Sequence, residues 1–453
     1  MSQHAHWVGD ADIALFTDLY ELRMLQAYWS TGMRETAVFS LFSRKLPERR
    51  NYLLACGLDD ALHCLERMRF SPGALAYLHS LPDFEDAFLE WLSEFRFTGD
   101  VHAVPEGTPV FPEEPILEVV APIAEAQLAE TVLMNQIHLQ TVLASKAVRV
   151  VEAARGRAAI VDFGMRRMHG ADAGLKSARA FYIAGVDSTS NVLAGRVYGI
   201  PISGTMAHSF IQAFDHEIDA FRAFARLYPE TVLLVDTYET VEGVRRVVDL
   251  ARELGADFRV RGVRLDSGDL AELAFRAREI LDAAGLYEVE IFASGGLDED
   301  EIAAILARGA PITGFGVGSA MAVSSDAPVL DIAYKLTAYA GVPRTKLSPG
   351  KRILPGRKQV FRIEEDGRAV RDVIARHDER HPGRPLLAPA MIDGRRRDAG
   401  MTDLAAARAR ARDEVARLPD RIRDIRIADP PYPVEISPGL NALLRETARR
   451  STG

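Results

Sequence analysis

Hydrophobic and polar positions along the middle of the chain alternate between strand-like runs and helical spacing. An apolar run at Ala158–Val161 predicts a buried strand that leads directly into the polar turn Asp162-Phe163-Gly164. A helix is predicted from about Leu175 to Ala184, ended by Gly185, and a second apolar strand is predicted at Gly199–Ser203.

The same alternation continues towards residue 320. Strands are predicted at 232–235, 260–265, 289–292 and 312–315, with helices at 241–255, 270–285 and 299–309. Six strand-helix units of this length imply a parallel sheet, either a barrel or an open sheet. In an open α/β sheet the chemistry-bearing turns gather at one switch point, whereas in a barrel they follow every strand. Because a polar turn follows every strand of this chain, we predict an irregular, incomplete parallel α/β barrel.

The flanking segments have a different pattern. On the N-terminal side, the patterns predict a strand at 38–46, a helix at 52–68, proline-broken β segments at 101–122 and a long helix at 124–154. On the C-terminal side they predict a hairpin of 359–363 with 369–375, a strand at 386–392 and a solvated helix at 402–427. We therefore predict that 1–123 and 341–453 form one discontinuous β-rich α+β domain with a terminal helix, and that 124–340 form the barrel.

The first predicted helix begins at Thr17. Asp18 and Glu21 have the spacing of a capping box, in which the two side chains bind each other's backbone N–H groups. From this pattern alone, Tyr20 is an ordinary packing residue.

Composition restricts the compartment and the partners. The 453 residues carry 55 Lys and Arg against 64 Asp and Glu, a formal net charge of −9, so no overall basic field favours nucleic acid. Two cysteines, Cys56 and Cys64, are too few for a disulfide framework. No apolar stretch resembles a signal peptide or is long enough to span a bilayer, so we expect a cytoplasmic protein.

Basic and glycine-rich turns follow the predicted strands. Arg166, Arg167 and His169 follow the first strand and His208 follows the second, which favours an anionic, phosphorylated substrate. Two later turns, Ser294-Gly295-Gly296 and Gly316-Val317-Gly318-Ser319, could line a phosphate with backbone N–H groups.

Other charged residues leave alternatives open. Asp236 and Asp266 could hold Mg²⁺ or a ribose diol, or could equally be N-caps of the following helices. The basic residues after Asp331 form either a phosphate-binding loop or a solvated connection; they are Lys335, Arg344, Lys346, Lys351, Arg352, Arg357 and Lys358.

Seven segments together resemble nicotinate phosphoribosyltransferases. They are TDLYELRMLQAYW, FSLFSRKLPERRNYLLACGL, DFGMRRMHGADAGLKSARA, STSNVLAGRVYGIPISGTMAHSF, VRLDSGDL, FGVGSAM and KLSPGKRILPGRKQVFR. The resemblance implies a type II phosphoribosyltransferase, a homodimer with shared active sites. It also implies the first step of NAD salvage from nicotinate. Nicotinate and 5-phosphoribosyl 1-pyrophosphate give nicotinate mononucleotide and pyrophosphate, coupled to ATP hydrolysis.

The resemblance also implies roles for individual residues. His208 matches the histidine that ATP phosphorylates, and Thr205 matches a nicotinate-binding position. Tyr20 matches an aromatic residue that reaches the pyridine ring from the partner subunit, while Phe163 would stack on the other face. Arg264 would pair with the nicotinate carboxylate or a nearby phosphate. The remaining matches concern the phosphoribosyl substrate. Arg166 matches a residue that binds this substrate, Ser319 with the adjoining Gly318 matches the sugar-phosphate site, and Asp236 and Asp266 match the neighbourhood of ribose and Mg²⁺.

The implied chemistry is displacement at the anomeric carbon by the pyridine nitrogen, which needs no base. Three alternatives remain. In a nicotinamide-using relative an acidic residue would stand where Asn191 is, because a carboxylate there would repel nicotinate. A phosphate-binding barrel isomerase or aldolase would explain only the glycine turns, and a nucleotide sensor would not need His208, Arg264 and Asp266. With no cysteine after Cys64, the chain cannot build a cysteine-based zinc element near its C-terminus.

Overall fold

The computed structural model describes residues 8–348, 353–401 and 403–452. Contacts between residues divide the chain into two compact units. Unit 1 comprises Met1–Val142 and Val329–Gly453, and unit 2 comprises Leu143–Pro328. Within the described part of the chain, no helix combines the length and apolar character needed to cross a bilayer.

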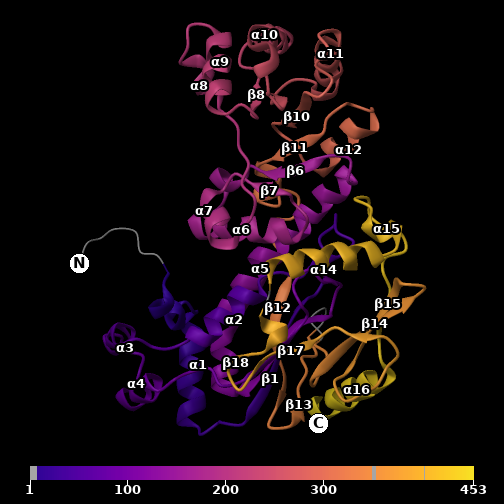
Figure 1. The fold of residues 1–453 in the computed structure, drawn as a ribbon. Coiled ribbons are helices and arrows are strands. Elements are labelled where there is room, and N and C mark those ends of the chain that lie inside the picture. Colours follow the sequence, from indigo (N-terminus) through magenta and orange to yellow (C-terminus); the bar gives the residue numbers. More distant parts are fainter. Residues whose placement is uncertain (1–7, 349–352, 402, 453) are drawn as a thin grey trace. The chain divides into compact units, whose positions relative to one another are not determined.

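Unit 1 is built on an antiparallel seven-stranded sheet. Its strand β1 (Thr36–Ser43) pairs with β12 (Ile332–Tyr339) on one side and β5 (Pro115–Pro122) on the other. Every β1 residue after Thr36 is buried, so both faces of this strand are covered, which explains its continuous rather than alternating apolar pattern. The full order is β13 (Val342–Pro343), β12, β1, β5, β3 (Asp100–Ala103), β17 (Ala388–Ile392) and β18 (Arg395–Arg396), as Figure 1 shows in part.

Two smaller sheets complete the β structure of unit 1. The first has the order β16 (Arg384–Pro385), β14 (Lys358–Glu365), β15 (Arg368–Arg376) and β19 (Val434–Ile436), and the second pairs β2 (Leu53–Leu54) with β4 (Pro109–Val110). The predicted hairpin is confirmed as β14 and β15. Its turn residues Asp366 and Gly367 have φ angles of 49° and 75°, the left-handed pair that a tight type I′ turn requires.

One helix of unit 1 begins later than the sequence predicted. The helices of this unit are α1 (Leu19–Ser30), α2 (Leu58–Arg67), α3 (Pro72–His79), α4 (Asp86–Ser93), α14 (Leu404–Arg417), α15 (Asp420–Arg423) and α16 (Pro438–Thr452), with 3-10 turns at Asp10–Leu15 and Asp398–Gly400. The long helix α5 (Ile123–Ala154) begins in unit 1, and its residues from Leu143 onward belong to unit 2. The helix predicted from Tyr52 begins only at Leu58, because Leu53 and Leu54 pair with β4. Gly57 then turns the chain at φ 98°, where a Cβ would lie 2.4 Å from the Gln136 carbonyl oxygen.

The predicted capping box of α1 is wrong. Asp18 is the N-cap residue but its side chain makes no capping hydrogen bond. Glu21 is fully buried instead of reaching back, and it accepts hydrogen bonds from the hydroxyls of Thr17 and, at 2.9 Å, Thr131. Burial raises the pKa of Glu21 to about 7.

The prediction of a solvated helix over 402–427 is also wrong for one face. Thr402 lies outside the described residues, and α14 ends at Arg417, before Leu418-Pro419. Glu414 on α14 is buried and accepts a hydrogen bond from the buried Arg362 at 3.4 Å. Arg362 also binds Asp372 at 2.6 and 3.0 Å, so an ion-pair network fixes α14 to the hairpin.

Unit 2 contains the predicted parallel sheet. Its order is β7 (Ser188–Thr189), β6 (Ala159–Asp162), β11 (Gly314–Val317), β10 (Glu290–Ser294), β9 (Gly262–Leu265) and β8 (Val232–Leu234), with every pair parallel. In the described residues the two outer strands, β7 and β8, do not pair with each other. The sheet is therefore a curled half-barrel rather than a closed barrel.

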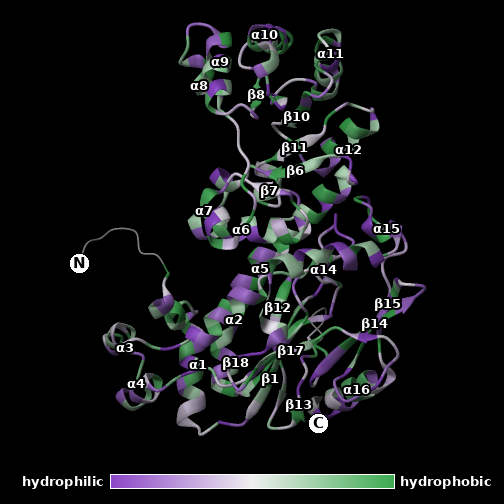
Figure 2. Cartoon of the chain, viewed as in Figure 1, coloured by the Kyte–Doolittle hydropathy of each residue, from purple (hydrophilic) through white to green (hydrophobic). Residues whose placement is uncertain are grey.

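Helices connect the strands of unit 2. They are α6 (Ala171–Ile183), α7 (Val192–Tyr198), α8 (His208–Gln212), α9 (Glu217–Leu227), α10 (Thr240–Leu254), α11 (Leu270–Ala283), α12 (Glu299–Ala307) and α13 (Ser319–Ala322), with 3-10 turns at Met165–Arg167 and Gly255–Asp257. Figure 2 shows that these helices carry both hydrophobic and hydrophilic residues. In α10 the buried side comprises Val241, Gly243, Val244, Val247, Val248 and Leu250, the spacing expected of an amphipathic helix.

The strand predicted at Gly199–Ser203 is wrong. Only Ile202 pairs there, in an isolated parallel bridge with Thr189 of β7. Gly199 ends α7 in the left-handed conformation, with φ 70°, and Pro201 has no N–H group to give to a ladder. The sixth strand is instead the two-residue β7, which is too short for a hydrophobic period.

Candidate active site

The carboxyl ends of the parallel strands in unit 2 bring most of the predicted site residues to one edge of the sheet. Parallel strands end on the same edge, so the turns after them are neighbours. The predicted residues in or after these strands are Phe163 and Arg166 at β6, Ser319 and Gly318 at β11, Gly295 and Gly296 at β10, Arg264 and Asp266 at β9, and Asp236 at β8.

Asp266 lies at the centre of a hydrogen-bonded group. Asp236 Oδ2 accepts from the Asp266 backbone N–H and from the Ser267 hydroxyl, both at 2.8 Å. The Ser294 hydroxyl donates to Asp266 Oδ1. The turns after three adjacent strands, β8, β9 and β10, are thus tied together by two carboxylates.

The N-cap alternative for both aspartates is wrong. The side chain of Glu239 caps α10 by accepting from the Glu242 N–H at 2.7 Å, and Asp269 caps α11 in the same way at 3.0 Å. Asp236 and Asp266 therefore remain available for the turns themselves. Asp236 Oδ1 is buried and has no hydrogen-bond partner in the part of the chain that the structure describes.

His208 begins α8 and reaches the same group. Its Nδ1 lies 3.1 Å from the Thr237 hydroxyl, and its Nε2 lies 3.8 Å from Asp266 Oδ2. About two fifths of the side chain is exposed, so the ring is oriented by protein groups on both nitrogens yet remains open to a ligand. Residues 202–208 run from the β7 edge, where Ile202 bridges Thr189, to the ends of β8 and β9.

Arg264 on β9 is a partly buried cation without a carboxylate partner. It donates from Nη1 to the Thr205 hydroxyl at 2.6 Å and from Nη2 to the Met206 carbonyl at 3.2 Å. Its Nε is buried and unpartnered, and among the described residues no carboxylate lies within ion-pair distance of it. Burial lowers the pKa of Arg264, partly opposed by Asp266 and Asp236, while Arg166 adds to the lowering. Such a group is suited to binding an anion.

Phe163 is positioned by the turn after β6. Asp162, which is buried, accepts hydrogen bonds from the Gly164 N–H and the Thr189 hydroxyl, both at 2.7 Å. The Phe163 ring lies against Gly316, where a Cβ would be only 2.4 Å away, and it is tilted by 48° to Phe292 at a centroid distance of 6.2 Å. Burial raises the pKa of Asp162, although these two hydrogen bonds lower it. Asp162, Thr237 and Ser294 organise the site but were not predicted to do so, because hydrogen-bond partners of this kind have no sequence motif.

The two glycine turns have the backbone that the prediction required. Gly295 and Gly296 have φ angles of 89° and 65°, and a Cβ on Gly295 would lie 1.9 Å from the Asp266 carbonyl oxygen. Gly318 precedes Ser319, the first residue of α13. Arg166, in the 3-10 turn after Phe163, is exposed at the same edge.

Tyr20 is the one predicted site residue in unit 1. It lies on α1 with 48 % of its surface exposed, and its hydroxyl is 3.3 Å from Glu21 Oε1. Burial, followed by the charges of Glu130 and Glu21, raises the pKa of Tyr20, so the phenol stays neutral.

Asn191 does not present a free side chain. It is buried, its amide nitrogen donates to the Gly174 carbonyl at 2.9 Å, and its amide oxygen caps α7 through the Ala194 N–H at 3.1 Å. Both ends of the amide are therefore used inside the protein.

Three of the basic residues after Asp331 have partners within unit 1. Lys358 is buried, forming an ion pair with Glu118 at 2.9 Å and donating to the Gly356 carbonyl at 2.6 Å. Lys335 pairs with Glu130 at 3.1 Å, and Arg357 lies 2.7 Å from His102 Nε2. Lys351 and Arg352 lie outside the described residues.

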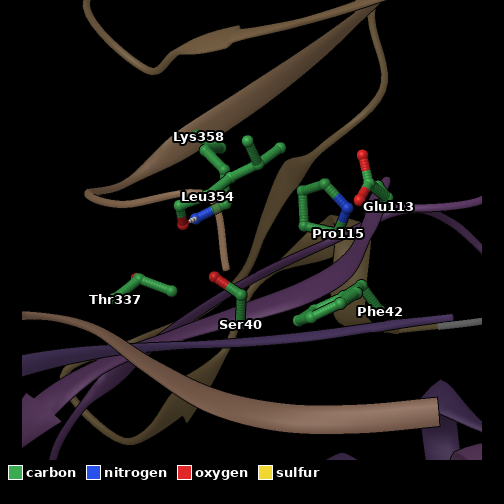
Figure 3. A pocket seen from close by; sticks show the side chains of 7 residues that line it. All are labelled: Ser40, Phe42, Glu113, Pro115, Thr337, Leu354 and Lys358. Carbon is green, nitrogen blue, oxygen red and sulfur yellow. Dashed lines mark hydrogen bonds between the residues drawn. The ribbon is translucent and has the colours of Figure 1, made fainter. Parts of the chain in front are cut away.

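The pocket beside Lys358 is too small for a substrate. Figure 3 shows its lining side chains, which are Ser40, Phe42, Glu113, Pro115, Thr337, Leu354 and Lys358. Its volume of about 10 Å³ is close to the space that one water needs. None of the site residues that the family resemblance implies lines this pocket.

A magnesium ion would find few protein ligands in unit 2. Among the described residues there is no group of three or more His, Cys, Asp or Glu side chains placed to hold a metal. Mg²⁺ usually binds one or two carboxylates together with substrate phosphates and waters. The free Oδ1 of Asp236 fits that mode.

The sequence and the fold both match known proteins. The nicotinate phosphoribosyltransferase (NAPRTase) N-terminal domain matches residues 15–138, and the NAPRTase family matches residues 158–353. The chain is 58 % identical to nicotinate phosphoribosyltransferase pncB2 of Mycobacterium tuberculosis over 94 % of this chain and 91 % of that protein. It is 40 % identical to nicotinate phosphoribosyltransferase of Bacillus subtilis over 82 % and 77 %.

A solved structure extends the match to the fold. The crystal structure of human nicotinic acid phosphoribosyltransferase superposes with a TM-score of 0.84 at 30 % identity, covering 95 % of this chain and 99 % of the human one. The matched segments include the strands whose carboxyl ends carry Arg264, Asp266 and Asp236. The chain belongs to the nicotinate phosphoribosyltransferase family.

Proposed function

We propose that this chain joins nicotinate to 5-phosphoribosyl 1-pyrophosphate, forming nicotinate mononucleotide and pyrophosphate in NAD salvage. Family membership supports the two substrates. The observation that carries the proposal is Arg264, a partly buried guanidinium with a free Nε and no carboxylate partner, beside Phe163 and Thr205. An aromatic ring that carries one carboxylate matches this combination in shape and charge.

The pyridine ring is held by stacking and by its carboxylate. Phe163 stacks on one face of the ring, the partner subunit's Tyr20 covers the other face, and Arg264 binds the carboxylate. This arrangement requires a homodimer with shared active sites. Held in this way, the ring nitrogen points along the line of attack, which reduces the entropic part of the barrier.

The reaction is a substitution at the anomeric carbon of the ribose. A bond from the pyridine nitrogen to C1′ forms while the bond from C1′ to the pyrophosphate oxygen breaks, and the transition state has oxocarbenium-like charge. No proton has to be removed from nicotinate, because its ring nitrogen is unprotonated near neutral pH. The backbone N–H groups at Gly295, Gly296, Gly318 and Ser319 bind phosphate oxygens, and Arg166 neutralises the leaving pyrophosphate.

Mg²⁺ would be held by Asp236, through its free Oδ1, and would neutralise charge on the pyrophosphate. Asp266 orients the ribose side of the site and, with Thr237, the imidazole of His208.

ATP hydrolysis is coupled to the transfer through His208. The bond between the γ-phosphorus of ATP and the bridging oxygen breaks and ADP leaves, while a phosphorus–nitrogen bond to the imidazole forms. Water later hydrolyses that bond, which releases inorganic phosphate and restores the imidazole. A partly exposed imidazole that lies beside Thr237 on one nitrogen and Asp266 on the other is suited to this role.

The test is product formation from 5-phosphoribosyl 1-pyrophosphate with nicotinate or nicotinamide, each with and without MgATP. We expect nicotinate mononucleotide, formed faster with MgATP. Turnover of nicotinamide but not of nicotinate would show that the proposed substrate is wrong. If neither compound were turned over, the proposed activity would be excluded.

A further inference from the structure

A buried cluster of four charges in unit 2 connects α5 to the segments that follow β10 and β11. These segments lie at the edge of the sheet where the carboxyl ends of the parallel strands meet, here called the catalytic edge. Lys146 on α5 is 1 % exposed, and its Nζ lies 2.5 Å from Glu299 Oε2 and 2.8 Å from Asp326 Oδ1. Arg149, one turn later, binds Glu299 Oε1 from Nε at 2.9 Å. Two positive and two negative charges therefore balance inside the unit.

The two acidic residues belong to different strand exits. Glu299 is the first residue of α12, directly after the turn that contains Gly295 and Gly296. Asp326 follows α13, the helix that begins at Ser319 after β11. Lys146 thus bridges the segments that follow the two glycine turns, which lie on adjacent strands, β10 and β11.

The cluster is poorly explained by stability alone. A buried ion pair seldom stabilises a fold more than well-packed apolar side chains would, because desolvation offsets the attraction. Arg149 Nη2 is moreover buried without a partner. Burial alone would raise the pKa of Glu299, but Lys146 and Arg149 hold it below its usual value, so the carboxylate stays charged and keeps a directional contact.

We propose that Lys146 is a positioning residue that sets the separation of the two phosphate-binding turns by holding Glu299 and Asp326 at one ammonium group. The inference rests on the proposed function, in which these turns bind the phosphates of 5-phosphoribosyl 1-pyrophosphate. Lys146 has no part in binding the pyridine ring, so its removal acts on one substrate.

The test compares Lys146→Met with the charge-balanced double variant Lys146→Met/Asp326→Asn. The single variant removes one of the two positive charges that balance the buried carboxylates of Glu299 and Asp326. We therefore expect a lower melting temperature and a KM for 5-phosphoribosyl 1-pyrophosphate that is raised about tenfold. The double variant should regain most of the melting temperature while that KM stays raised at least fivefold and the KM for nicotinate stays within twofold of wild type. Recovery of both the melting temperature and the KM in the double variant would overturn the proposal, as would an equal rise of both KM values.

A matched control and a binding measurement separate this proposal from the proposed function. Lys358→Met removes another buried lysine ion pair, in unit 1, and should lower the melting temperature without raising the KM for 5-phosphoribosyl 1-pyrophosphate selectively. If wild type lacks transferase activity, calorimetric titration with inorganic pyrophosphate still decides. The double variant should bind pyrophosphate at least fivefold more weakly than wild type does. Equal affinities of the two proteins, or no binding of pyrophosphate to wild type, would exclude the proposed role of Lys146.

Discussion

The guanidinium carbon of Arg264 lies 5.9 Å from the centre of the Phe163 ring. Arg264 is on β9 and Phe163 follows β6, and two strands separate them in the sheet. In a flat sheet three strand spacings amount to roughly 14 Å. The curl of the half-barrel brings the carboxyl ends of β6 and β9 towards each other, which shortens the distance that the two side chains have to span.

Replacing Arg264 tests whether it binds the carboxylate. Arg264→Gln should raise the KM for nicotinate about 10- to 100-fold, since a charge-assisted hydrogen bond contributes roughly 1.5–3 kcal/mol. Arg264→Lys should recover only part of this, because one ammonium cannot replace a guanidinium fork. Steady-state kinetics with each substrate varied in turn measures the effect, and an unchanged nicotinate KM in Arg264→Gln would exclude the contact.

His208→Ala should abolish the stimulation of transfer by ATP while reducing the basal rate much less. Thr237→Val, which keeps the imidazole but removes its Nδ1 neighbour, should reduce the stimulation only partly. Rates with and without MgATP, together with phosphate incorporation from γ-labelled ATP, give the comparison. Equal loss of basal and stimulated rates in His208→Ala would contradict a coupling role.

Gly295→Ala should disrupt the catalytic edge. The new Cβ would lie 1.9 Å from the Asp266 carbonyl oxygen, so the backbone of the β9 turn has to move. Gly309→Ala is a matched control, because Gly309 has a similar positive φ of 77° but no atom within 4 Å of the Cβ position. Each substitution costs about 1–2 kcal/mol of backbone strain. Only Gly295→Ala should also lower kcat/KM, by more than tenfold, and equal kinetics in the two variants would show that the close approach to Asp266 is unimportant.

Glu21 makes the stability of unit 1 depend on pH. Its folded pKa of about 7 lies above the ordinary 4.5, so the folded state binds the proton more tightly. The stabilisation is complete below about pH 4.5 and is lost as the pH rises through 7, by roughly 1–3 kcal/mol. Glu21→Gln stays neutral and should gain stability over wild type between pH 5 and 8.

Thermal unfolding across that range measures the difference, with Glu90→Gln on the exposed side of α4 as the control. A constant offset between wild type and Glu21→Gln at every pH would mean that Glu21 does not titrate in this window.

The main features of unit 2 could be predicted from the sequence because each of its long elements has a strong local signal. Strands such as Ala159–Asp162 are apolar and end at an aspartate, and the helices between the strands are amphipathic. The two-residue strand β7 could not be predicted in this way, since it depends on pairing with β6 and on the bridge to Ile202.

Side-chain partners were harder to predict than elements. Asp18 and Glu21 have capping-box spacing, yet Glu21 is buried and accepts a hydrogen bond from Thr131 of α5, a helix that lies far from it in the sequence. Glu414 was predicted to face solvent because it lies in an arginine-rich helix, but it is buried and accepts a hydrogen bond from Arg362 of β14. The chemistry-bearing residue types at strand ends were found from the sequence, whereas their connections, such as Ser294 with Asp266, depend on tertiary structure.

The outer strands of the three larger sheets are all very short. β13, β16, β18 and β7 have two residues each, β8 and β19 have three, and both β13 and β16 contain a proline. An unpaired strand edge is a template on which a strand of another chain can pair. A short or proline-containing edge strand offers few backbone groups for such pairing. The half-barrel can therefore stay open for its substrates, and the protein should remain resistant to edge-to-edge aggregation at high concentration in the cell.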